Sequence, residues 1–329
     1  MKNSVFQIQV ARPIYNQLRI DVHTSKLSHR SVKMVISSSE SKFIIEGCRD
    51  DCRVDGRSRK DFRLYSSVVG DFALSHGSAR IFLATKETHV LVSTKAELVV
   101  PASSAPSEGA VEVHVDYMQG NNSSSRDDDL QYTLSNLLVP HLVDREKLCV
   151  APHYFVWKLN IDVLVITSGG GSLIDACSQG IHAALQQTLL PRLTVVPASE
   201  GKGNKPTVQV DGDIKAAKCI PGVEDAPIIV TVSLLRHKKT PVMIVDATEE
   251  EEACAFARVH IVLDRGKSSS SKKSREPMIC ALHTAGGGAL PFALVQDVAS
   301  FVLEASGSSR VVVSKSLHHM LQDNFSIQQ

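Results

Sequence analysis

The sequence predicts a single domain of the α+β class, on the basis of three observations. Apolar and polar residues alternate with a period of two in several stretches after residue 61, which is typical of half-buried strands. Each group of such stretches is followed by residues with the three-to-four spacing of an amphipathic helix. This order occurs twice, so we expect two similar halves packed into one domain over residues 34–325.

In the first half, alternation predicts strands over residues 61–69, 78–84, 89–100 and 110–117. A long and mostly apolar strand is expected over residues 154–167, and its composition indicates that it is largely buried.

A helix between these strands begins near the three aspartates of residues 127–129, which suit the positive end of a helix. Pro140 is expected to end or kink this helix. Its predicted apolar face consists of Leu130, Leu134, Leu137, Leu138 and His141.

In the second half, residues 227–235 and 241–247 predict a hairpin, and residues 277–285 predict a further strand. A helix is expected from Thr248 onward, and a C-terminal helical region over residues 290–321. The stripe assigned to the helix that follows Thr248 is Ala253, Phe256, Ala257, His260 and Ile261. On such a stripe His260 is expected to be a core histidine rather than a catalytic base.

The composition excludes some classes of function. Lys and Arg number 36 against 35 Asp and Glu, so contacts with nucleic acid would need a local patch or an assembly. No apolar run reaches the roughly 18 residues of a membrane helix, and we expect no membrane contact. The closest cysteine pair, Cys48 and Cys52, lacks a second pair of ligands, so no metal site is expected and a reducing compartment fits best.

Residues 1–33 differ in composition from the rest, with six basic residues and one acid, Asp21. Such a segment is typical of a mitochondrial transit peptide, and also of a disordered extension ahead of a second start at Met34. We favour the extension. A second low-complexity segment, residues 266–276, is expected to be a solvated surface loop, with RNA contact through its lysines as the alternative.

Two short motifs have the form of functional sites. The glycine run of residues 168–172 precedes a helix, where backbone N–H groups attract anions, but it lacks the lysine of a phosphate loop. We therefore prefer a tight turn, with Ser172 and Asp175 as a capping box. That helix should pack through Ala176, Cys177, Gly180, Ile181, Ala184 and Leu185.

The second motif is Asp246 followed by four glutamates at residues 249–252. Consecutive acids point in different directions around a helix, so at most two share a target. The structural interpretation is that these residues form the acidic first turn of a helix. The functional interpretation is that they carry out acid/base chemistry.

The order of several motifs resembles the RNase PH-like subunits of the RNA exosome. GGxLxDA, followed in register by VDATxxEEA, is the specific part of this resemblance, which covers residues 35–321. The stretches that carry it are DCRVDGRSRKDFR, HGSARIFL, HVLVSTKAEL, LCVAPHYFVWKLNIDVLVI, GGGSLIDACSQGIHAAL and VDATEEEEACAFA.

The resemblance implies an RNase PH-like fold, also described as ribosomal protein S5 domain 2-like, with two βαβ-like halves. It implies a heterodimer with another RNase PH-like subunit in a six-membered ring, with cap proteins and with RNA in a central channel. It implies no cofactor, and a location in the nucleus, nucleolus and cytoplasm.

Active members of that family cut RNA with inorganic phosphate, which they bind through Gly-Ser-Arg or Gly-Thr-Arg. The matching positions here are Gly171, Ser172 and Leu173, and leucine offers no charged fork to a phosphate. In the family's D-L-N-x-x-x-D motif, Asp246 matches the first aspartate and Glu252 the catalytic last one. Glutamate is one methylene longer, and a misplacement of about 1 Å costs about a hundredfold in rate.

The resemblance therefore implies a non-catalytic structural subunit that supports 3'-5' RNA processing, rRNA maturation and mRNA turnover. The alternative is an active phosphorolytic 3'-5' exoribonuclease. A nucleotide-binding enzyme that uses the glycine runs is the third reading, and it lacks a phosphate lysine. Basic residues that reach RNA in non-catalytic subunits are replaced by Asn136 and Pro140. Arg80 is the remaining candidate for RNA contact, and we prefer a structural ion pair for it.

Overall fold

The computed structural model of the chain describes residues 36–83, 87–118, 124–197, 205–238, 240–264, 277–286 and 290–306. From Ile36 onward these residues form one compact unit. The basic segment 1–33, the predicted loop 266–276 and the part of the predicted C-terminal helical region beyond residue 306 lie outside the described residues.

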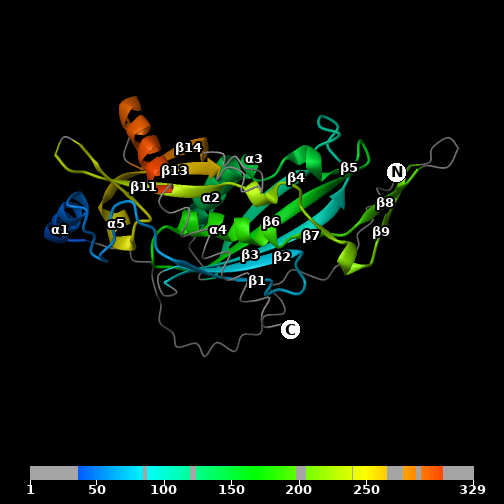
Figure 1. Cartoon of the computed structure of the whole chain (residues 1–329), viewed down its shortest axis with the longest axis horizontal. Coiled ribbons are helices and arrows are strands. Elements are labelled where there is room, and N and C mark those ends of the chain that lie inside the picture. The colour runs from blue at the N-terminus through cyan, green and yellow to red at the C-terminus, as the bar shows by residue number, and fades with distance from the viewer. Residues whose placement is uncertain are drawn as a thin grey trace, which may run out of the picture. The chain divides into compact units, whose positions relative to one another are not determined.

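The larger sheet has the strand order β1-β2-β3-β6-β4, and β5 also pairs with β6 (Figure 1). All its ladders are antiparallel except that of β4 and β6. The predicted strands are confirmed, although residues 61–64 precede the first strand. The bounds are β1 Tyr65–Val69, β2 Gly77–Leu83, β3 Thr88–Val99, β4 Ala110–Tyr117, β5 Cys149–Ala151 and β6 Phe155–Ser168.

A helical crossover joins the parallel strands β4 and β6, as parallel pairing requires. It consists of α2 (Ser124–Thr133), a π-helical turn (Leu134–Leu138), α3 (Val139–Leu142) and a 3₁₀ turn (Arg145–Leu148). The expected kink is confirmed, because the π turn immediately precedes Pro140 in the first turn of α3.

The predicted apolar face of this crossover is confirmed in its first part and wrong at its end. Leu134, Leu137 and Leu138 are buried, whereas His141 is exposed and Leu142 is buried in its place. A π turn holds one more residue than an α turn, so it rotates the following side chains by one position.

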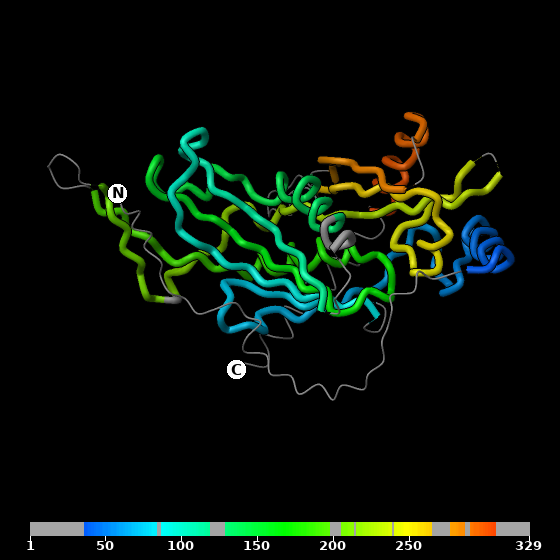
Figure 2. The backbone as a smooth tube through the Cα atoms, turned by 180° about the vertical axis from the view of Figure 1, so that it is seen from behind, coloured from blue at the N-terminus to red at the C-terminus, as the bar shows by residue number. Residues whose placement is uncertain are grey.

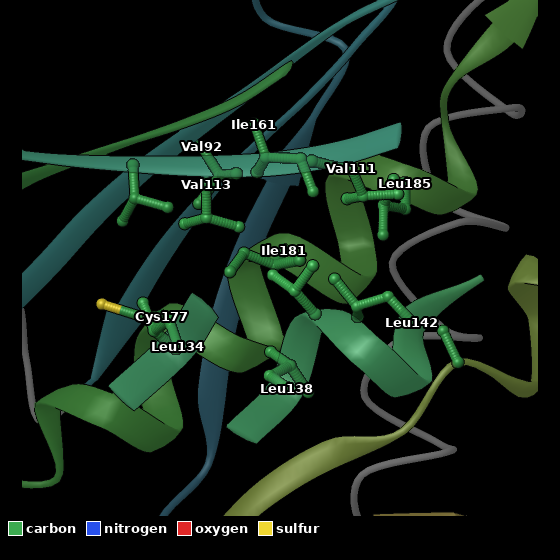
Figure 3. Packing of buried hydrophobic residues seen from close by; sticks show 14 of the residues in the cluster. Val92, Val111, Val113, Leu134, Leu138, Leu142, Ile161, Cys177, Ile181 and Leu185 are labelled. Atoms are coloured by element: carbon green, nitrogen blue, oxygen red, sulfur yellow. The ribbon is translucent and has the colours of Figure 1, made fainter. Parts of the chain in front are cut away.

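Helix α4 (Leu173–Gln186) lies between the two sheets. It contacts β2 and β3 of the larger sheet and β11 of the smaller one. Figure 3 shows Cys177, Ile181 and Leu185 of α4 packed among valines of the larger sheet and leucines of the crossover. The predicted stripe is confirmed, and the helix is buried on its other sides as well. Gly180 permits this close approach, because a Cβ there would stand 2.7 Å from a methyl carbon of Val92.

The smaller sheet has the order β12-β11-β13-β14, all antiparallel. Its bounds are β11 Ile228–Leu235, β12 Val242–Val245, β13 Ala255–Asp264 and β14 Met278–Gly286, so the predicted hairpin and last strand are confirmed. The residues of β11 alternate between two layers. Ile229 packs with the core around α4, whereas Val230 and Val232 pack with Val298 and Val302 of the helix over residues 292–306.

The predicted long helix after Thr248 is wrong. Helix α5 spans only Glu249–Cys254, and Ala255 begins β13, the centre of the smaller sheet with β11. β-Branched residues and two-sided burial favour a strand here, and the partners β11 and β14 supply the hydrogen bonds. Strands β12 and β13 both pair with β11, so this half is a βαβ unit whose strands are separated by β11.

Helix α1 (Ser38–Arg49) packs against α5 and β12 through Ile44 and Cys48. Figure 2 shows α1 in blue beside the yellow turn that contains α5. Two further two-stranded antiparallel sheets are formed by β7 (Leu189–Leu190) with β10 (Lys218–Cys219) and, in the segment between them, by β8 (Leu193–Val196) with β9 (Thr207–Val210). Short 3₁₀ turns lie at Ile214–Ala216 and Val223–Asp225.

Candidate functional site

The candidate site lies where the glycine turn after β6 meets the turn after β12. Gly171 has φ +72°, and a Cβ there would stand 2.5 Å from the carbonyl oxygen of Ala247. Only glycine permits both that conformation and that approach. Thr88 fixes the turn, because its hydroxyl accepts a hydrogen bond from Gly170 N and donates one to Gly171 O. The tight turn preferred from the sequence is confirmed, and it brings Gly171 and Ser172 against residues 246–252.

Asp246 is held by two arginines that precede β1. Its carboxylate accepts hydrogen bonds from Arg57 Nη1 at 3.0 Å, and from Arg63 N, Nε and Nη2 at 2.6, 3.0 and 2.6 Å. The carboxylate is fully buried, and the backbone has a left-handed φ of +45°. Burial alone raises the pKa of Asp246, but Arg63 and Arg57 outweigh it and lower the pKa below its ordinary value.

Arg63 also ties the two turns together. Its guanidinium donates to the carbonyl oxygens of Gly170 at 2.6 Å and Ala247 at 3.1 Å. These hydrogen bonds occupy both carboxylate oxygens of Asp246 and fix the geometry of the turn.

Glu252 reaches the N-terminus of α4. Its Oε1 accepts from the backbone N–H of Ser172 at 2.7 Å, and its Oε2 lies 3.5 Å from Arg258 Nη1. The pKa of Glu252 is raised by burial, against the lowering effects of Arg258 and of the Ser172 amide. A carboxylate of the chain itself thus occupies a backbone donor that would attract an anion at a helix start.

The predicted capping box of Ser172 and Asp175 is wrong. Ser172 has a left-handed φ of +48°, its side chain caps nothing, and its hydroxyl donates to Ala247 O at 3.0 Å. Asp175 turns away from the helix end to Thr231 on β11, where it accepts from the Thr231 N–H and contacts its hydroxyl. Tertiary partners in the second half therefore outcompete the local cap.

The acid run does begin a helix, and its capping box is at Thr248 and Glu251. Glu251 is buried and paired with Arg53, whose Nε lies 2.9 Å from Oε1. Arg53 further donates to the carbonyl oxygens of Val245 and Asp246. The expectation that at most two of the four glutamates share a target is met, since Glu251 and Glu252 point to different partners.

The other predicted residues take structural positions. Leu173 packs at the edge of the core around α4. Arg80 pairs with Asp71 at 3.1 Å, the ion pair that we preferred to RNA contact. His260 is a core histidine, bonded through Nδ1 to the Thr231 hydroxyl at 2.9 Å.

Sequence reasoning missed four residues of the site, Arg53, Arg57, Arg63 and Thr88. The first three come from the stretch DCRVDGRSRKDFR, whose density of arginine beside aspartate is the signal of a buried ion-pair network. In the described part of the chain no cluster of His, Cys, Asp or Glu could hold a metal ion. Cys48 is buried while Cys52 is exposed. No helix of the same residues is long and apolar enough to cross a membrane.

Comparison with known proteins gives a consistent picture. The profile of the 3' exoribonuclease family, domain 1 (RNase PH), matches residues 61–191. Exosome complex component RRP45A of Arabidopsis thaliana is 27% identical over 237 residues, or 70% of this chain and 73% of that protein. Exosome complex component Rrp42 of Thermococcus kodakarensis is 29% identical over 248 residues, or 73% of this chain and 85% of that protein.

A solved structure has the same fold. The Archaeoglobus fulgidus exosome with RNA bound to the active site contains a chain that superposes with a TM-score of 0.58 at 19% identity, covering 82% of this chain and 96% of that one. The two-half α+β fold predicted from the sequence is therefore confirmed as the RNase PH-like fold. Residues 61–191 are an RNase PH domain, and the chain is a homologue of exosome complex components.

Proposed function

We propose that this chain is a non-catalytic structural subunit of an RNA exosome ring, which supports 3'-5' RNA processing and degradation. One observation carries the proposal. The two carboxylates that match the catalytic motif are both engaged by the chain itself, Asp246 by Arg57 and Arg63 and Glu252 by the Ser172 amide.

Phosphorolysis needs a bound phosphate and a carboxylate free to act on it. Leu173 stands where active subunits have arginine, and it packs at the edge of the core. The cation nearest to Glu252 is Arg258, which is partly exposed and paired with Glu252. A phosphate approaching Ser172 N–H would have to displace a negative carboxylate that already satisfies the donor, which is unfavourable on charge and on hydrogen bonding.

The partners proposed are another RNase PH-like subunit as heterodimer neighbour within a six-membered ring, exosome cap proteins, and RNA through the central channel. Locations in the nucleus, nucleolus and cytoplasm belong to the same proposal. In the described fold, strand β1 comes first in the order of the larger sheet, and both Val68 on it and Leu64 just before it are exposed. Exposed apolar area at the end of a sheet is suited to packing against a neighbouring subunit.

The first test is an assay of RNA cleavage. Purified chain is incubated with single-stranded RNA, inorganic phosphate and magnesium, and nucleoside diphosphates are measured. We expect the wild type to release no more nucleoside diphosphate in the presence of phosphate than Glu252→Ala does. Glu250→Ala is the control, because Glu250 is exposed. Release by the wild type that Glu252→Ala abolishes and Glu250→Ala preserves would instead establish the active exoribonuclease.

The second test addresses assembly. The double variant Leu64→Asp, Val68→Asp should lose co-purification with RNase PH-like partners, because it places charges on the β1 edge. Val100→Asp, a charge at another exposed apolar position, should keep it. Retention of partners by the double variant, or equal loss in both, would refute the β1 interface. Absence of exosome subunits from wild-type purifications would refute the proposed function itself.

A further inference from the structure

A buried series of hydrogen bonds joins α4 to the smaller sheet, and it does not include the carboxylates of Asp246 and Glu252. Asp175 of α4 lies 2.5 Å from the Thr231 hydroxyl of β11, and that hydroxyl lies 2.9 Å from His260 Nδ1 of β13. Asp175, Thr231 and His260 expose 2%, 6% and 3% of their surface. The Thr231 N–H donates separately to the other oxygen of Asp175.

This chain of atoms permits two arrangements of hydrogens, because a hydroxyl both donates and accepts. With Asp175 ionised, Thr231 donates to Asp175 and accepts from Nδ1–H of His260. With Asp175 protonated, the carboxylic acid donates to Thr231, and Thr231 donates to a bare Nδ1, so that the ring carries its hydrogen on Nε2. In both arrangements His260 is neutral, and the Asp175 carboxyl group, the Thr231 hydroxyl and His260 Nδ1 are all hydrogen-bonded.

We propose that Asp175, Thr231 and His260 form a proton-linked junction, in which uptake of one proton reverses both hydrogen bonds and changes the tautomer of His260. The atoms balance when the proton arrives at Nε2. The Nδ1 hydrogen passes to Thr231 Oγ1, and the former hydroxyl hydrogen passes to Asp175 Oδ1. The net change is one proton on the carboxylate, with no imidazolium at either end point.

The surroundings favour a proton on Asp175 over one on His260. Burial, with the charges of Asp246 and Glu252, raises the pKa of Asp175 to about 7, although the Thr231 hydrogen bonds lower it. Burial also lowers the pKa of His260 to about 3, helped by Arg258 and by His283, whose ring stacks at 6.2 Å on β14. Among the described residues Tyr65 and Cys177 also feel the charge of Asp175, and the pKa of each is raised by burial.

The junction lies where α4 meets the second half of the fold. Helix α4 contacts both sheets, and Asp175 lies in its first turn, three residues after Ser172. Ionisation of Asp175 therefore adds a third negative charge to those of Asp246 and Glu252, at the contact between the two halves. This inference concerns the folded chain alone and does not depend on the exosome assignment.

Nitrogen-15 NMR of histidine-labelled full-length chain tests it. The His260 signals, assigned by their loss in His260→Gln, should report a neutral ring throughout, with hydrogen on Nε2 near pH 5.5 and on Nδ1 near pH 8.5. The exchange should have a midpoint near pH 7. A single tautomer across this range, or an imidazolium appearing at the lower pH, would overturn the proposal.

Two variants separate the junction from a general effect of pH. Asp175→Asn presents a permanent N–H donor to Thr231, so His260 should stay in the Nε2–H form at every pH. Thr231→Val removes the relay at nearly constant size, so the tautomer should no longer follow pH. Unchanged tautomer exchange in either folded variant would contradict the proposal, and Thr231→Val decides the matter if Asp175→Asn does not fold.

Discussion

At the scale of single residues, the buried guanidinium of Arg53 shows how the site is held together. Its guanidinium bonds both oxygens of Glu251 and the carbonyl oxygens of Val245 and Asp246, with none of the side chain exposed. Removing one member of a buried pair leaves the other charge without compensation.

We therefore expect Arg53→Met to lower the free energy of unfolding by about 3–5 kcal/mol. Arg49→Met is the matched control, because Arg49 pairs with Asp50 on the surface of α1 and its loss should leave stability unchanged within error. Urea denaturation of both variants measures the difference. Equal stability of the two would show that the buried network contributes nothing.

The two titratable ends of the buried chain have opposite effects on stability. The pKa of Asp175 is raised from 3.8 to about 7, so its contribution is present at low pH and is lost as pH rises through that range. The pKa of His260 is lowered from 6.5 to about 3, so its contribution is present above 6.5 and is lost as pH falls toward 3. In the wild type these trends oppose each other.

In Asp175→Asn only the effect of His260 on the free energy of unfolding should remain. Between about pH 4 and pH 6.5 its free energy of unfolding should rise with pH more steeply than that of the wild type, by up to about 1.4 kcal/mol per pH unit. His260→Gln should show the reverse, a decline toward pH 7. Unfolding by urea at several pH values checks both, and parallel curves for all three proteins would exclude the opposed titrations.

At the scale of elements, the glycine turn is fixed by what it touches. Gly171 and Gly56 have similar φ angles, +72° and +82°, but a Cβ at Gly56 would meet nothing within 4 Å. At Gly171 it would meet Ala247 O at 2.5 Å and Thr248 C at 2.8 Å, both backbone atoms.

Gly56→Ala should therefore cost only the left-handed conformation, about 1 kcal/mol. Gly171→Ala adds overpacking against a backbone that cannot move aside, for a total of about 2–4 kcal/mol. Thermal unfolding of the two variants gives the comparison. A loss at Gly56 as large as that at Gly171 would mean that conformation alone decides, and that the contact with residues 247–249 is unimportant.

The elements also show where prediction from sequence fails. Residues 255–261 carry apolar side chains at helical spacing and at strand spacing at once, so periodicity does not separate the two. The partners β11 and β14 decide for a strand. At Ser172 and Asp175 the local motif is a real helix-start pattern, but Thr231 and Ala247 attract those side chains instead.

At the scale of the whole molecule, α4 is the shared layer of the two halves. It packs on the larger sheet, while β11 connects it to the helix over residues 292–306 through the opposite face of the smaller sheet. A substitution that destabilises the second half should therefore also destabilise the first half.

Ile261→Ala tests this coupling, because Ile261 is buried in the second-half cluster. It should cost about 2–5 kcal/mol and shift the unfolding midpoint seen by fluorescence of Trp157, the one tryptophan, as much as that seen by circular dichroism. Val100→Ala, at an exposed position, should shift neither. An unchanged fluorescence midpoint with a two-step circular dichroism curve would indicate halves that unfold independently.

The sequence by itself determined the class of fold, most of the strands, the apolar stripe of α4 and the tight turn at Gly171. These follow from local periodicity and from the steric freedom of glycine, and the motifs in register pointed to the RNase PH-like family. Only the tertiary structure decided the partners of the charges. Asp246, Glu251 and Glu252 lie close together in the sequence, yet their hydrogen bonds come from Arg53, Arg63 and Ser172, which are about 80 to 200 residues away. Burial makes each of these pairings strong and an unpaired charge costly, and neither burial nor long-range proximity can be read from spacing.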